Sequence, residues 1–122
     1  MSNDIDRIVQ IERQLSKLES TATNLETLSV LVSRSNRTQE AKMLSDQAVD
    51  LRLKQFTLYR NKARLQVDTK EWKALVSALE LVNHFIDEAI ADLKVLKEVQ
   101  DSAARLLSVA TKITAAFSDK AL

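Results

Sequence analysis

The stretch VQDSAARLLSVATKITAAF (residues 99–117) decides the fold of this chain, because it has the spacing of an amphipathic helix with a wide apolar face. The architecture depends on whether this face packs against the chain's own helices or against another molecule. The side chains expected to form it, together with the preceding turn, are Leu96, Val99, Ala103, Leu106, Leu107, Ala110, Ile113 and Phe117.

The composition of the chain indicates an all-α protein. Among its 122 residues 45% are apolar and 29% are charged, which is typical of a folded, soluble domain. Glycine and proline are both absent, although average usage would supply about fourteen of them. Hairpins and bulges depend on glycine for positive φ angles, whereas helix interiors need neither residue. We therefore expect a single helical domain over residues 1–122.

Other global features exclude several classes of protein. The chain has no cysteine, so it can form no disulfide and no thiolate metal site. No apolar segment of a signal peptide follows Met1, and no run approaches the roughly 18 apolar residues of a membrane span. The net charge of +1 indicates no electrostatic partner. A cytoplasmic protein is expected.

Heptad patterns predict three long helices, at about residues 4–34, 37–67 and 69–118, in an elongated up-down-up antiparallel bundle. The second helix carries two apolar stripes roughly 140° apart, which predicts a middle helix between two neighbours. One stripe consists of Ala41, Leu44, Ala48, Leu51, Leu58 and Leu65. The other consists of Val49, Leu53, Phe56, Ala63 and Val67.

Short polar segments separate the predicted helices. Asn36 either ends the first helix in the left-handed region or caps the second. Asp68, followed by Glu71, is the expected N-cap of the third helix.

The predicted helices differ in length, and this difference raises the question of association. The first two span roughly 46 Å each and the third roughly 72 Å. Either the third helix breaks near residues 100–102 into a short fourth helix, or it continues beyond the bundle. The unbroken heptad register favours the continuous helix. Its apolar face would then need a second chain, with Gln100 as the buried polar residue that fixes register.

Candidate chemistry is sparse. Glu80, His84 and Glu88 share one helix face with the spacing of metal ligands, but this face lies opposite the apolar seam and should be solvated. We therefore predict no metal, cofactor or catalytic residue, and no enzymatic activity. Trp72 is expected to close one end of the core.

A basic segment crosses the second helix. Arg52, Lys54, Arg60, Lys62 and Arg64 contribute five positive charges with no acidic residue among them. At 100° per residue they point to all sides of the helix, whereas residues 71–101 carry a net charge of −4. Charge-matched packing of the second and third helices is the favoured interpretation.

The sequence thus favours a non-enzymatic protein–protein interaction or scaffold module that self-associates through the C-terminal part of its third helix. One alternative is nucleic-acid binding through four cations, Arg52, Lys54, Arg60 and Arg64. Another is a role at a lipid surface or in a pore, because long amphipathic helices are also typical of such proteins.

Overall fold

The computed structural model describes residues 2–121, and the side chains of residues 4–117. Four α-helices account for most of this part of the chain: α1 (Ser2–Arg34), α2 (Thr38–Arg60), α3 (Lys70–Ala91) and α4 (Leu96–Ala121). Two short 3₁₀ helices, η1 (Lys62–Arg64) and η2 (Leu93–Val95), lie in the connections. The described residues contain no strand, which confirms the all-α prediction.

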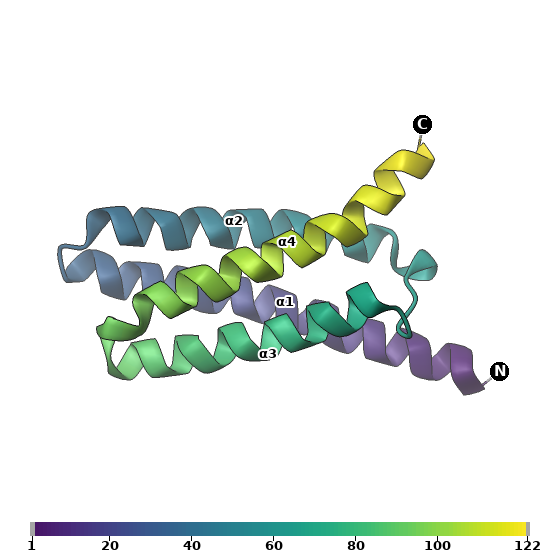
Figure 1. Cartoon of the computed structure of the whole chain (residues 1–122), viewed down its shortest axis with the longest axis horizontal. Helices are drawn as coiled ribbons and strands as arrows, with labels where there is room; N and C mark the ends of the chain where they lie inside the picture. The colour runs from purple at the N-terminus through teal and green to yellow at the C-terminus, as the bar shows by residue number, and fades with distance from the viewer. Residues whose placement is uncertain (1, 122) are drawn as a thin grey trace.

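The four helices lie side by side and alternate in direction along the chain (Figure 1). The main contacts of α1 are with α2 and α3, and those of α4 are also with α3 and α2. The helices therefore form a ring in the order α1, α2, α4, α3, with α2 and α3 on a diagonal. The molecule is an up-down-up-down four-helix arrangement, not the predicted bundle of three.

The prediction of a continuous third helix is wrong, because the helix ends at Ala91 and the chain reverses there. Asp92 takes up an extended conformation (φ −149°, ψ 107°), and its Oδ1 accepts a hydrogen bond of 3.0 Å from the backbone N–H of Lys94. An aspartate in this position satisfies an N–H that the next helix leaves free. The alternative break, predicted at residues 100–102, was placed about two turns too late.

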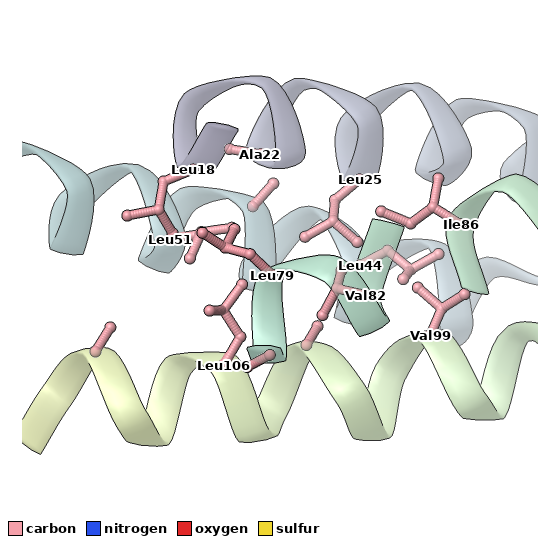
Figure 2. Close-up of a cluster of buried hydrophobic side chains, with 14 of the residues drawn as sticks. Leu18, Ala22, Leu25, Leu44, Leu51, Leu79, Val82, Ile86, Val99 and Leu106 are labelled. Carbon is pink, nitrogen blue, oxygen red and sulfur yellow. The ribbon is translucent and has the colours of Figure 1, made fainter. Parts of the chain in front are cut away.

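The heptad register continues through the reversal because α3 and α4 supply their apolar stripes to the same core. Figure 2 shows side chains from all four helices meeting there. The labelled residues, each at most 1% exposed, are Leu18, Ala22, Leu25, Leu44, Leu51, Leu79, Val82, Ile86, Val99 and Leu106. Fully burying a leucine or isoleucine side chain stabilises a fold by about 1.5–3 kcal/mol. Folding back therefore removes the need for a second chain to cover α4.

The remaining connections differ in detail from the predictions. Asn36 has φ 63° and ends α1 in the left-handed region, which decides between the two predicted roles. The helix α2 ends at Arg60, seven residues before the predicted 67. The N-cap of α3 is Thr69 and not Asp68, since the Thr69 hydroxyl accepts a hydrogen bond of 3.1 Å from the backbone N–H of Trp72. Trp72 itself is 3% exposed, so its predicted burial is confirmed.

Candidate functional site

The face predicted to bind a second chain is covered by the chain's own helices. Five of its residues are buried in the bundle core: Leu96, Val99, Ala103, Leu106 and Ala110. The other three, Leu107, Ile113 and Phe117, are partly buried and pack against that core. The expectation that this face stands free is wrong, and the reason for assigning an intermolecular interface to it is removed.

Gln100, the predicted register residue, makes its contact within the chain. The Nε2 group of Gln47 on α2 donates a hydrogen bond of 3.0 Å to the backbone carbonyl of Gln100 on α4. Two buried atoms of the same pair, Gln47 Oε1 and Gln100 Nε2, have no hydrogen-bond partner among the described residues. The contact therefore joins α2 to α4 through the Gln100 backbone, and the Gln100 side chain contributes no hydrogen bond to it.

Most cations of the basic segment pair with acids on α1 and α2. An Arg52 nitrogen lies 3.1 Å from a carboxylate oxygen of Glu26, and Lys62 Nζ lies 3.4 Å from Glu12 Oε2. Charge-matched packing is therefore present, but the prediction that the third helix supplies the acids is wrong. The reason is topological: α2 and α3 lie on a diagonal of the ring, whereas α1 lies beside α2.

The four residues considered for nucleic-acid contact do not share one face. Arg52 turns toward α1, where it also donates to the Thr23 hydroxyl at 3.3 Å. Lys54 Nζ lies 4.0 Å from Asp50 Oδ1. The guanidinium of Arg60 lies 5.7 Å from the ring centre of Phe56. This scatter does not form the continuous basic track that a phosphate backbone requires.

The last of the four cations, Arg64, is the final residue of η1, in the connection that follows α2. Its guanidinium stands 5.5 Å from the ring centre of Phe117 on α4. Arg64 Nη1 also donates a hydrogen bond of 3.4 Å to Asn61 Oδ1. Arg64 thus helps to hold the C-terminal turns of α4 against the connection that follows α2.

The single histidine lies in an open groove between α1 and α3. His84 Nε2 is 3.0 Å from Glu88 Oε1, and both side chains are exposed. Among residues 4–117 no group of three histidine or carboxylate side chains could hold a metal ion. The groove is lined by Lys17, Ser20, Leu79, Glu80, Asn83, His84 and Asp87.

The second apolar stripe of α2 is the main unexpected surface. Val49, Leu53 and Phe56 were predicted to face a neighbouring helix, but they are 53%, 60% and 56% exposed. Lys42 and Asp46 precede them and Arg60 follows, all exposed, so the six residues keep a 4-3-4-3-4 spacing. We call Lys42, Asp46, Val49, Leu53, Phe56 and Arg60 the outer stripe of α2. The heptad spacing of Val49, Leu53 and Phe56 is visible in the sequence, but these side chains were predicted to pack against a neighbouring helix and not to face solvent.

Charges at the N-terminal end of the outer stripe are paired. Lys42 Nζ donates a hydrogen bond of 2.8 Å to Asp46 Oδ2, and this contact raises the pKa of Lys42 above its ordinary value. The two side chains are 76% and 64% exposed, so the pair is largely open to solvent. At the other end, Arg60 has no carboxylate oxygen within 4.0 Å among the described ion pairs. The N-terminal end of the outer stripe therefore carries an aspartate paired with a lysine, and the C-terminal end carries an arginine that is not paired with a described carboxylate.

Further apolar side chains continue from the end of α2 onto the first turns of α1. Ile5 and Ile8 are 66% and 43% exposed. Ile8 shares a small apolar hollow with Ile11, Lys62 and Ala63. This end of the molecule therefore exposes apolar surface from two helices.

Comparison with known proteins adds no assignment to these observations. No helix among the described residues is long and apolar enough to cross a membrane. No protein-family model matches the chain, and neither a curated protein nor a solved structure matches it.

Proposed function

We propose that this protein is a non-enzymatic protein–protein interaction module, and that the outer stripe of α2 is its docking surface for a helix. The observation that carries the proposal is the exposure of Val49, Leu53 and Phe56, each more than half exposed, at heptad spacing. Single exposed apolar residues are ordinary, but a row of them along one helix is typical of a binding surface.

The spacing of the outer stripe suits a helical partner. Residues separated alternately by three and four positions form one seam, into which the side chains of a second helix insert as knobs into holes. Covering Leu53 and Phe56, each a little over half exposed, would recover roughly half of the 1.5–3 kcal/mol that full burial of such side chains provides.

The bundle also holds the backbone of the outer stripe in its helical conformation before any partner binds. The opposite face of α2 is anchored in the core through Leu44, Leu51 and Leu58, which are at most 1% exposed. A helix that is already folded and fixed loses little conformational entropy on binding. This rigidity distinguishes α2 from an amphipathic segment that must fold on its partner.

The outer stripe is preferred over the apolar face of α4 on grounds of accessibility. Leu107, Ile113 and Phe117 already pack against the core, so a partner there would have to displace intramolecular contacts. A partner of α2 would displace water from Leu53 and Phe56, and would disturb only the contact between Arg60 and the Phe56 ring.

Site-specific photo-crosslinking tests the proposal. A benzoyl-phenylalanine is placed at position 53 or, as a control, at position 81, where Leu81 is an exposed leucine of α3. Both full-length variants are produced in the source cells and irradiated, and their adducts are identified by mass spectrometry. We expect a defined protein adduct, with this chain or another protein, from position 53 and none from position 81. Lipid-only adducts, or no adduct, from position 53 would overturn the proposal.

A further inference from the structure

We propose that the helix bound by the outer stripe is α2 of a second copy of this chain, in antiparallel orientation about a two-fold axis. This inference rests on the proposed function and names the partner.

The charges at the ends of the outer stripe are complementary only in the antiparallel orientation. Asp46 stands before the apolar residues, and Arg60 stands after them without a carboxylate partner in the described structure. A parallel pair of helices would place Asp46 beside Asp46 and Arg60 beside Arg60. An antiparallel pair brings each aspartate toward the other copy's arginine, and the symmetry repeats this contact.

The heptad spacing selects a register. When the two-fold axis passes between residues 54 and 55, Leu53 of each copy faces Phe56 of the other. Val49 then faces the aliphatic part of the second copy's Arg60. The guanidinium can extend one further turn along the seam, where Asp46 lies. In this arrangement Val49, Leu53 and Phe56 all contact the second copy. Asp46 and Arg60 form the contacts between unlike charges.

Two contacts of exposed side chains compete with this arrangement in the free molecule, Lys42 with Asp46 and Arg60 with the Phe56 ring. The hydrogen bond between Lys42 and Asp46 joins two largely exposed side chains, and such pairs contribute at most about 1 kcal/mol. Each carboxylate has two oxygens and can accept from Lys42 and from an arginine at once. The ring of Phe56, now beneath Arg60, is free to contact Leu53 of the second copy because its own helix covers less than half of it.

The size of the surface sets the expected strength of the dimer. From Lys42 to Arg60 the outer stripe runs for roughly 27 Å and is about one helix wide. Such a face buries less than the roughly 800 Å² per partner of a standard stable interface. A dimer that dissociates at micromolar or higher concentrations is therefore expected, and not a permanent assembly.

Charge reversal tests the inference by sedimentation velocity of the full chain over a concentration series. We expect reversible dimerisation of the natural chain and a dissociation constant raised by about tenfold or more in D46R and in R60D, since each reversal creates two like-charge contacts. The double variant D46R/R60D restores the unlike pairs and should return to within about threefold of the natural chain. E80R, a reversal at an exposed carboxylate of α3, is the matched control and should dimerise like the natural chain.

Each result has a defined consequence once circular dichroism shows that the variants are folded. A natural chain that stays monomeric at all concentrations overturns the inference. A dimer that is insensitive to D46R and R60D, or is not rescued by the double variant, overturns the antiparallel α2 contact. If the chain is monomeric but position 53 crosslinks to a different protein, this inference fails and the proposed function stands. If no adduct forms either, both fail.

Discussion

Leu106→Ala tests whether α4 belongs to the core of its own chain. Leu106 is 0% exposed and lies among core residues of the other helices (Figure 2). Removing three carbon atoms loses about 2.4 kcal/mol of transfer free energy at roughly 0.8 kcal/mol per group. The unfilled cavity adds to this loss, and measured costs of such core changes are about 2.7–5 kcal/mol. We expect the free energy of unfolding to fall by about 3 kcal/mol.

The measurement is urea denaturation followed by circular dichroism, with thermal unfolding as a second readout. For a chain of this length, a loss of about 3 kcal/mol lowers the melting temperature by roughly 12 °C. The control is Leu81→Ala, since Leu81 is 40% exposed and its truncation should cost well under half as much. Equal and small effects, within about 0.5 kcal/mol of the natural chain, would refute the folded-back position of α4 and restore the projecting helix.

Three further predictions concern the turn, the surface and the polar pair. Asp92→Ala should lower the free energy of unfolding in urea by about 1 kcal/mol, because it removes a helix cap. The control Asp68→Ala should change this free energy little, because Thr69 is the cap of α3. Leu53→Asp should leave that free energy within about 0.5 kcal/mol of the natural value, because the side chain is exposed. The same change should abolish the dimer formed through α2 in sedimentation velocity, because it places a carboxylate on the apolar seam. Gln100→Met should raise the free energy of unfolding by about 1 kcal/mol, because it removes the buried donor Nε2, which has no partner among the described residues. The backbone carbonyl of residue 100, which accepts from Gln47, is kept in this variant. A loss of stability in this last variant would contradict the assignment of an unsatisfied donor.

Much of the local structure of this protein is determined by short-range physics that can be read from the sequence. The absence of glycine and proline excludes most turns other than helix ends, so the all-α class follows directly. The 3.6-residue period of a helix places Leu44, Leu51 and Leu58 on one face. Asn36 was recognised as a boundary because asparagine tolerates the left-handed conformation.

Only the tertiary structure decided where the long third pattern breaks and which apolar faces are covered. An apolar heptad register is the same whether α4 continues from α3 or folds back on it, so the register could not reveal the turn at Asp92. Likewise, the two stripes of α2 are equivalent in the sequence, and the choice of which one is buried depends on where three other helices lie. Once α4 fills the fourth place in the ring, Val49, Leu53 and Phe56 are left at the surface. Periodicity determines which residues share a face, but burial is a property of the whole assembly of helices.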